Sequence, residues 1–262
     1  LREMTGEIEA AAAHKLPALV GYEDLQGCFH CHTTYSDGHD SVEAMVKAAQ
    51  KLGLKYFGIA DHSQSLAFAR GLTVDRLKEQ QAEIDKVAAR VKGIRVFKGT
   101  EVDILQDGKL DYDDATLGTF DYVVASVHTH FGLPEAEMTK RIVKALEHPK
   151  VTMLGHATGR LLLRRDGYKL DLETILKTAA KHNKMIEINA HPQRLDLDWI
   201  HCKKAKELGV TLVINPDAHS VRDIEYLPFG IAVARRGWLE KDNVFNTKSA
   251  AEVAKDLEAR RA

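Results

Sequence analysis

The sequence predicts an α/β fold, a closed barrel built from seven strand–helix units. Three observations support this prediction. From residue 26 onward, short apolar runs alternate with amphipathic helical segments, which is typical of a parallel sheet. No Pro- or Ser-rich linker interrupts the series. Polar side chains of functional type follow the apolar runs, and barrels of this kind carry their active sites at the carboxyl ends of the strands.

Periodicity and helix-end signals place the individual elements. Residues 1–24 are interpreted as a helical lead-in or linker with a loop at Leu16-Pro17, and residues 25–262 as the barrel domain. The apolar runs predict strands at about 26–32, 55–60, 94–100, 121–127, 151–155, 185–189 and 210–215. Apolar faces with helical spacing predict helices at about 40–53, 73–92, 134–147, 171–183, 196–209, 221–235 and 248–260.

Composition restricts the class of protein. The chain has 262 residues and a net charge of −1, so it does not attract polyanions as a whole, and any nucleic-acid binding must come from a local arginine-lined cleft. It lacks an apolar run long enough for a membrane span, so no membrane partner is expected. Its three cysteines have no disulfide spacing, which predicts a reducing, cytoplasmic location. Leu rather than Met stands at position 1, which allows the chain to be a fragment.

Histidine is unusually frequent, with 13 residues, and its placement is the strongest functional signal. Six of the seven predicted strands end in a possible metal ligand, and one more carboxylate follows the first strand. Any single histidine of this kind is more often a surface or hydrogen-bonded core residue, but the joint pattern favours a metal site. The nine candidate ligands are His30, His32, Asp37, His62, Glu101, His128, His156, Asp217 and His219.

The ligand types predict the chemistry. Nine ligands exceed the needs of one tetrahedral ion, and imidazole with carboxylate suits Zn, Mn or Fe rather than Ca or Mg. A cluster of two or three ions can hold a bridging hydroxide as the nucleophile and neutralise phosphoryl oxygens. The sequence therefore predicts a metal-dependent hydrolase of phosphate esters.

Four segments carry a family resemblance. GCFHCHTTYSDG, IADHS, ASVHTH with LGH, and NPDAH resemble the four motifs of the polymerase and histidinol phosphatase (PHP) superfamily. The resemblance implies a distorted, TIM-like (β/α)7 barrel with a trinuclear site. In it, His30, His32, Glu101 and Asp217 would hold the first metal. Glu101 would bridge the first metal and a second one, which His128 and His156 would also hold. A third metal would be held by Asp37, His62 and His219.

A more specific resemblance covers nearly the whole chain. Runs such as RGLTVDRLKEQ, GTEVDILQDGKLDYDD and HATGRLLLRRDGY are similar to the C-terminal PHP domain of bacterial and archaeal family X DNA polymerases. That family implies a Mn-dependent 3′→5′ exonuclease and phosphodiesterase acting on single-stranded or gapped DNA 3′ ends. It also implies a polymerase domain N-terminal to this chain in a full-length protein, with residues 1–24 as the link.

One position departs from the family. Cys28 stands where the family usually has Asp, two residues before His30. Strand alternation predicts that the Cys28 side chain points into the barrel beside His30 and His32. The simpler interpretation is that Cys28 only packs in the core. The alternative is that it lies near the metals, either beside a metal ligand that it helps to tune or as a soft sulfur ligand itself. Cys31 is expected to face the helices, and Cys202 to lie in the core.

Further candidates surround the ligands. Glu101, Asp217 and Arg160 are predicted to be catalytic, and Arg70, Arg160, Arg164 and Arg194 to bind substrate phosphates. Loop salt bridges are the competing interpretation for these arginines. Asp61 is expected to orient a histidine, and His191 is a candidate general acid. Aromatic residues in loops that offer stacking surfaces are Tyr35, Phe68, Phe131, Tyr168 and Trp199.

Two other functions compete with DNA end processing. The same metal site suits a small-molecule phosphatase, phosphodiesterase or phosphotriesterase, which the neutral composition favours. A binding module with a degenerate site is the third possibility, and it requires lost ligands, whereas all nine positions are filled.

Overall fold

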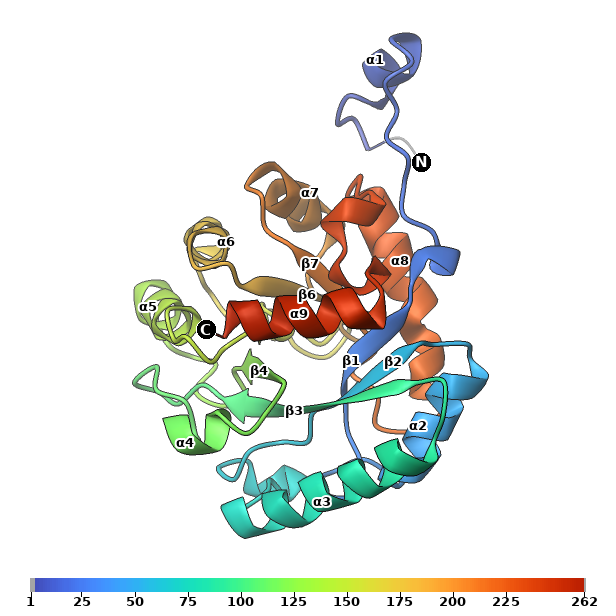
Figure 1. The fold of residues 1–262 in the computed structure, drawn as a ribbon. Helices are drawn as coiled ribbons and strands as arrows, with labels where there is room; N and C mark the ends of the chain where they lie inside the picture. Colours follow the sequence, from blue (N-terminus) through green and yellow to red (C-terminus); the bar gives the residue numbers. More distant parts are fainter. Residues whose placement is uncertain (1–2, 262) are drawn as a thin grey trace.

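The barrel is confirmed. A computed structural model describes residues 3–261 and contains one sheet of seven parallel strands in the order β1 to β7, so that strands consecutive in the chain are neighbours in the sheet (Figure 1). The first and last strands come close enough to nearly close the ring. The strands are β1 Gly27–Cys31, β2 Tyr56–Ile59, β3 Arg95–Asp103, β4 Tyr122–Ser126, β5 Met153–Leu154, β6 Met185–Asn189 and β7 Leu212–Asn215.

Helices surround the ring of strands, and their ends follow local capping chemistry. Ser41, Thr73, Asp171 and Asp198 each accept a backbone N–H in the first turn of the helix that follows. The helices are α1 Glu7–Ala12, α2 Val42–Lys51, α3 Val74–Arg90, α4 Asp114–Leu117, α5 Glu135–Leu146, α6 Leu172–Lys181, α7 Trp199–Glu207, α8 Leu227–Arg236 and α9 Ala250–Arg260. Short 3-10 turns cover Tyr22–Asp24, Ala67–Ala69, Asp223–Tyr226, Lys241–Asn243 and Phe245–Thr247.

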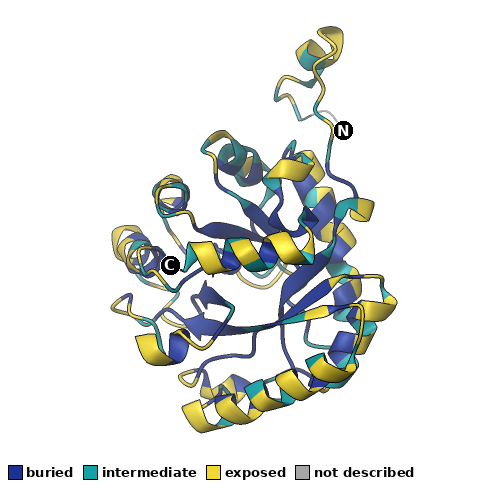
Figure 2. Ribbon diagram, viewed as in Figure 1, coloured by how far each residue is buried: buried dark blue, intermediate teal, exposed yellow. Residues whose placement is uncertain are grey.

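Two apolar cores hold the barrel together. The larger core lies between the strands and the surrounding helices, and the smaller one fills the barrel near the amino ends of the strands. Phe29, Tyr122 and Phe245 meet there, and Val253 and Leu257 of α9 close that end. Figure 2 shows the buried strands behind the half-exposed α9. The opposite end of the barrel, at the carboxyl ends of the strands, is left for polar side chains.

Side chains join β1 to β7 at the seam of the barrel. The Asn246 amide donates to the carbonyl oxygens of Gly27 and Ile214, and its oxygen accepts the Ile214 N–H. Asn215 accepts the Phe29 N–H. Past the strand ends, the His32 N–H donates to the Ala218 carbonyl at 2.8 Å. These bonds hold the loops that follow β1 and β7 side by side, which matters because both loops carry candidate ligands.

The predicted orientation of Cys28 is wrong. Cys28 packs in the outer core between sheet and helices, and Phe29 is the residue that fills the barrel. The pairing of β1 with β2 shifts between Cys28 and Cys31, and His30 has φ 56°, so the strand has an irregularity at this point. A bulge of this kind breaks the alternation of side chains. Phe29 and His30 therefore both face inward, and Cys31 faces the helices as predicted.

Several element boundaries also differ from the prediction. β3 continues past Glu101 to Asp103, and a short helix, α4, forms in the region expected to be a loop. The helix predicted at 221–235 is divided into a 3-10 turn and α8. In the described part of the lead-in, residues 3–24, the α-helix is limited to Glu7–Ala12, and this helix, α1, projects from the barrel (Figure 1). Within residues 3–261, no helix combines the length and apolar character that crossing a membrane requires.

Candidate metal centre

All nine predicted ligands gather at the carboxyl end of the barrel. Six of them are buried, and Asp37, His128 and His219 are half-buried. β1 and β3 provide His30 and Glu101, and the segments that follow the strands provide the remaining seven. The arrangement follows from the fold, since the carboxyl ends of parallel strands in a barrel meet at one rim.

Glu101 lies at the centre of this group. Its carboxylate oxygens lie 2.9–3.6 Å from ring nitrogens of five histidines. Only 1% of its side chain is exposed, so these contacts are made away from water. The five histidines around Glu101 are His30, His32, His62, His128 and His156. One carboxylate shared by so many imidazoles is suited to bridging two cations.

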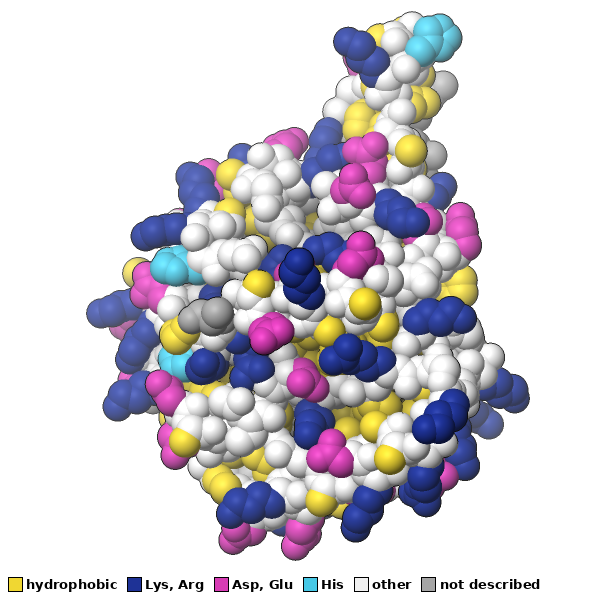
Figure 3. Space-filling view, viewed as in Figure 1, with side chains coloured by type: hydrophobic (Ala, Val, Ile, Leu, Met, Phe, Trp, Pro, Cys, Tyr) yellow, Lys and Arg dark blue, Asp and Glu magenta, His cyan; other side chains and the backbone are white. Residues whose placement is uncertain are grey.

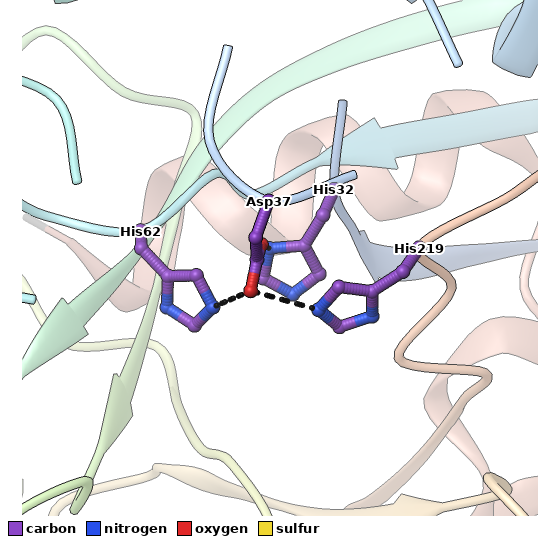
Figure 4. Close-up of side chains that lie close together, drawn as sticks. All are labelled: His32, Asp37, His62 and His219. Atoms are coloured by element: carbon purple, nitrogen blue, oxygen red, sulfur yellow. Dashed lines mark ion pairs between the residues drawn. The ribbon is translucent and has the colours of Figure 1, made fainter. Parts of the chain in front are cut away.

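The ligand atoms form overlapping groups in which every atom lies within 4.8 Å of the others. His30 and His32 group with Asp217, and Glu101 groups with His30 and His156 and, separately, with His62 and His128. In the fourth group, the Asp37 carboxylate lies between His62 and His219, at 3.5 and 3.4 Å, with the His32 ring behind it (Figure 4).

The residues fit divalent cations. Ring nitrogens of His30, His32 and His62 and one Glu101 oxygen are buried without a hydrogen-bond partner among residues 3–261. Buried polar atoms are rarely left without a partner, so these atoms point to a ligand. Imidazole with carboxylate is the donor set of Zn, Mn and Fe sites. In addition, His30, His156 and Asp217 have positive φ of 56°, 24° and 51°, a strain that is concentrated at functional sites.

Outer partners fix the orientation of the rings. Glu187 lies 2.6 Å from Nδ1 of His30, and Asp103 lies 2.6 Å from Nδ1 of His128. The Nδ1 of His219 is 3.0 Å from the Asp217 carbonyl oxygen. An acceptor at Nδ1 places the proton there and leaves Nε2 free to bind a metal. Glu187 and Asp103 were not identified from the sequence.

Glu187 connects several parts of the centre. Besides His30, it accepts the backbone N–H of His156 at 2.7 Å, and amide groups of Asn189 and Asn215 at 3.2 and 2.9 Å. Asn189 also donates to Asp217 at 2.9 Å. The only signal in the sequence was a charged residue within the apolar strand MIEIN, two positions before Asn189 and therefore on the same face.

Asp61 has a different role from the one expected. Its oxygens accept hydrogen bonds from the backbone N–H and hydroxyl groups of Thr33 and Ser36, and from the Gln80 amide. Asp61 therefore fixes the loop that carries Asp37, instead of orienting a histidine. The sequence could not show this because the loop's path depends on contacts between β1 and β2.

The local electrostatics follow from burial and charge pairing. Burial disfavours the ionised Glu101 carboxyl, but the surrounding histidines, His30 first, hold its pKa well below the usual range. Burial and the neighbouring His219 and His62 rings lower the pKa of His32 to about 4. Burial also lowers the pKa of His62 and His219, but carboxylates outweigh it. Glu101 and Asp37 raise that of His62 to about 10, and Asp37 and Asp217 raise that of His219 to about 9.

The predicted arginines occupy different positions. Nε of Arg194 lies 3.1 Å from Asp217, so this residue reaches the ligands. Arg160 donates to the carbonyl oxygens of Arg194 and Leu195, so its guanidinium fixes the loop after β6. Its guanidinium also lies 3.8 Å from the Asp198 carboxylate, as the competing interpretation of a loop salt bridge expects, and the predicted phosphate contact of Arg160 stays a prediction. Arg70 and Arg164 are exposed.

His191, the candidate general acid, lies half-buried after β6. Its ring packs edge-on against Tyr226, with centroids 5.1 Å apart, and burial lowers its pKa. An acid role at neutral pH requires a protonated ring, so this shift disfavours the suggestion.

Comparison with known proteins identifies the family. A model of the PHP domain matches residues 29–191. The chain belongs to the PHP family. A probable phosphatase of Caldicellulosiruptor saccharolyticus (strain ATCC 43494 / DSM 8903 / Tp8T 6331) is 32% identical to this PHP chain over 212 residues, which cover 74% of the chain and 80% of that protein. As a member of the family, the chain is a metal-dependent hydrolase of phosphoric esters.

A second relative is longer than this chain. The DNA polymerase/3'-5' exonuclease PolX of Bacillus subtilis (strain 168) is 45% identical over 235 residues, which cover 90% of the chain but only 41% of that protein. This identity supports the resemblance to the PHP domain of family X polymerases.

A solved structure has the same fold. Histidinol phosphate phosphatase from Lactococcus lactis subsp. lactis Il1403, complexed with Zn, L-histidinol and phosphate, superimposes with a TM-score of 0.60 at 19% identity. The match covers 80% of this chain and 93% of that one. At this identity the likeness shows the architecture alone.

Proposed function

We propose that the chain holds three divalent ions, Mn, Zn or Fe, and hydrolyses phosphodiester bonds at DNA 3′ ends. The observation that carries the proposal is the position of Glu101 between five histidines. The first ion would be held by His30, His32, Glu101 and Asp217. The second would be held by Glu101, His128 and His156, and the third by Asp37, His62 and His219. The close groups His30–His32–Asp217 and His32–Asp37–His62–His219 support the first and third sets, and His32 stands close to both. His128 and His156 each group with Glu101, but not with each other.

The residues of the chain contribute binding and charge. When bound, divalent ions supply Lewis-acid stabilisation of phosphoryl oxygens and lower the pKa of an attacking water. Glu101 and Asp217 are the proposed catalytic carboxylates, since both are buried among the ligands: Glu101 lies near five histidines, and Asp217 lies within 3.8 Å of His30, His32 and His219. Arg194, next to Asp217 and 18% exposed, is placed to bind a phosphoryl oxygen of the substrate. Arg70 and Arg164 are proposed to bind phosphates farther along the substrate.

The specific substrate rests on the relatives. The 45% identity to a protein named as a 3'-5' exonuclease supports DNA ends, single-stranded or gapped. By the same comparison, residues 1–24 are proposed to link the barrel to a polymerase domain in a longer protein. All three cysteines are free and buried, which agrees with a proposed cytoplasmic location.

A second candidate function is hydrolysis of small phosphate esters. It is favoured by the probable phosphatases, which match this chain over most of their own length. These relatives support phosphate-ester hydrolysis as well as the PolX comparison does. They favour small esters, instead of DNA, as the substrate.

A substrate panel separates the two functions. The purified chain, loaded with Mn, is incubated with a 5′-labelled oligonucleotide, bis-p-nitrophenyl phosphate and p-nitrophenyl phosphate. Stepwise shortening of the oligonucleotide from its 3′ end supports the DNA function. Turnover of the small esters with an intact oligonucleotide would overturn it in favour of the second candidate. Undiminished turnover after removal of all divalent metal would overturn both.

A further inference from the structure

Two loops beside the metal centre start from candidate ligands. The first, residues 63–72, follows His62 and returns to it, since the Leu72 N–H donates to the His62 carbonyl at 2.9 Å. We call it the His62 loop. The second, residues 157–168, follows His156 and is closed by a bond from the Tyr168 N–H to the Thr158 carbonyl at 3.0 Å. We call it the His156 loop. Compact loops with adjacent ends are often functional.

Each loop presents one large apolar side chain and one arginine to solvent. In the His62 loop, Phe68 is 80% exposed, and the exposed Arg70 follows two residues later. In the His156 loop, Leu163 is 106% exposed, and the exposed Arg164 follows directly. Neither guanidinium forms an ion pair with another of the described residues. Both loops therefore combine a large, uncovered apolar side chain with a free positive charge.

One residue of each pair has an uncommon backbone conformation. Arg70 and Leu163 have φ of 55° and 64°, a conformation that non-glycine residues rarely adopt. The His156 loop is further fixed by a hydrogen bond from the Leu162 N–H to the Gln193 carbonyl at 2.6 Å. Gln193 precedes Arg194, which contacts Asp217, so this loop is joined to the ligands at two points.

The two loops start from neighbouring rings. The His62 and His156 rings both lie next to that of His128, with ring centroids 5.0 and 5.2 Å from it. A molecule bound at the metal centre therefore lies beside the start of both loops. A small ester bound by the ligands and Arg194 has no need of exposed groups at the loop tips.

We propose that the tips of the His62 and His156 loops form the binding surface for a single-stranded nucleic-acid end, with Phe68 and Leu163 against bases and Arg70 and Arg164 against phosphates. Aromatic side chains that stack on bases, next to cations that bind the backbone, are a general means of holding single strands. Phe68 suits this role, and Leu163 adds an apolar surface for a base. Local arginines are needed here because the chain has a net charge of −1. On the face drawn in Figure 3, basic and acidic side chains are intermixed. This inference rests on the proposed function and names the residues that select its substrate.

Kinetics on two substrates test the apolar side chains. Phe68→Ala and Leu163→Ala are each expected to lower kcat/KM for a single-stranded, 5′-labelled 20-mer by about tenfold, from the usual value of a lost base contact. Their turnover of bis-p-nitrophenyl phosphate should remain at the wild-type level. Ile8→Ala is the matched control, because Ile8 is 62% exposed on α1, which projects from the barrel. Unchanged kinetics on both substrates, or an equal loss on both, would overturn the proposal.

A binding measurement distinguishes a failure of this proposal from a failure of the proposed function. Affinity is measured by fluorescence anisotropy with a phosphorothioate oligonucleotide at several salt concentrations. Arg70→Ala and Arg164→Ala should each reduce the slope of log affinity against log salt by about 0.7, and Arg90→Ala, on the exposed end of α3, should leave it unchanged. If the wild type binds the strand through these residues but hydrolyses only small esters, the nuclease function fails and the surface stands. If it shortens the strand and the four loop variants behave as wild type, the surface is wrong.

Discussion

The Glu187 carboxylate lies 2.6 Å from Nδ1 of His30. Glu187 stands on β6, which pairs with β5, the strand that precedes His156. It is fully buried, and its pKa is lowered because the charge of His30 outweighs the effect of burial. As an ionised acceptor, it keeps the proton on Nδ1 and directs Nε2 of His30 toward Glu101 and Asp217, at 3.1 and 3.6 Å. One residue outside the ligand set therefore orients the ligands of two proposed metal positions.

The variant Glu187→Gln tests this relationship. Glu187 accepts hydrogen bonds from four donors, and a glutamine amide would point its NH2 group at two of them. We expect metal affinity to fall by about 10- to 100-fold, as is usual for the loss of an outer partner. Titration calorimetry with Mn measures it, with circular dichroism to check folding. Glu173→Gln is the control, because Glu173 lies on the surface of α6 and pairs with Lys177. Wild-type affinity in Glu187→Gln would contradict the account.

Replacement of Glu101 by Ala should affect two ions at once. The carboxylate is within 3.6 Å of five histidine rings, and its loss leaves these rings facing each other without a negative charge. We expect phosphoesterase activity to fall by more than about 100-fold, since a ligand contributes more than an outer partner. Metal content is measured by mass spectrometry after dialysis. A variant that retains its metal and a near-normal rate would rule out the bridging role.

Metal binding should release protons at neutral pH. The pKa of His62 is raised to about 10 and that of His219 to about 9, so both rings are protonated at pH 7 without metal. A cation requires the neutral rings and must displace these protons, and its apparent affinity therefore increases as the pH rises toward 9. Titration calorimetry at pH 7 in buffers of different ionisation enthalpy gives the number of protons. Proton uptake, or affinity that falls from pH 6 to 8, is the opposite result.

Arg194 is expected to act on substrate binding. Its Nε lies 3.1 Å from Asp217, and its partly exposed guanidinium has further donors for a phosphoryl oxygen. Arg194→Ala should raise KM for bis-p-nitrophenyl phosphate by about tenfold or more, the usual value of a charged hydrogen bond. Metal content should stay the same. If metal is lost and KM is not raised, Arg194 instead positions Asp217.

The sequence predicted most of the architecture, and the convergence of the nine candidate ligands, for one physical reason. In a parallel barrel, the carboxyl ends of all strands meet at one rim, so residues such as His62, His128 and His156 can be assigned to a common site from their place in the chain alone. Strand alternation failed at His30, because the backbone irregularity there places two consecutive residues inside. The orientation of Cys28 was therefore wrong.

The outer partners could not be predicted in the same way. Glu187 and Asp103 lie within strands, where a buried carboxylate has several possible partners, and only the three-dimensional register shows which ring each one meets. The same holds for Asp61, which fixes the loop of Asp37 through Thr33 and Ser36. In the same way, the sequence could not show that the Arg160 guanidinium donates hydrogen bonds to the loop after β6.

Counting the bound metal ions is the most direct test of the central claim, which is the trinuclear centre. A crystal of the chain grown with Mn, with diffraction data collected for anomalous scattering, locates each ion independently of activity. The account predicts three anomalous peaks within bonding distance of the nine ligands, with Glu101 between two of them. A single peak, or peaks away from Glu101, would contradict the proposed trinuclear centre.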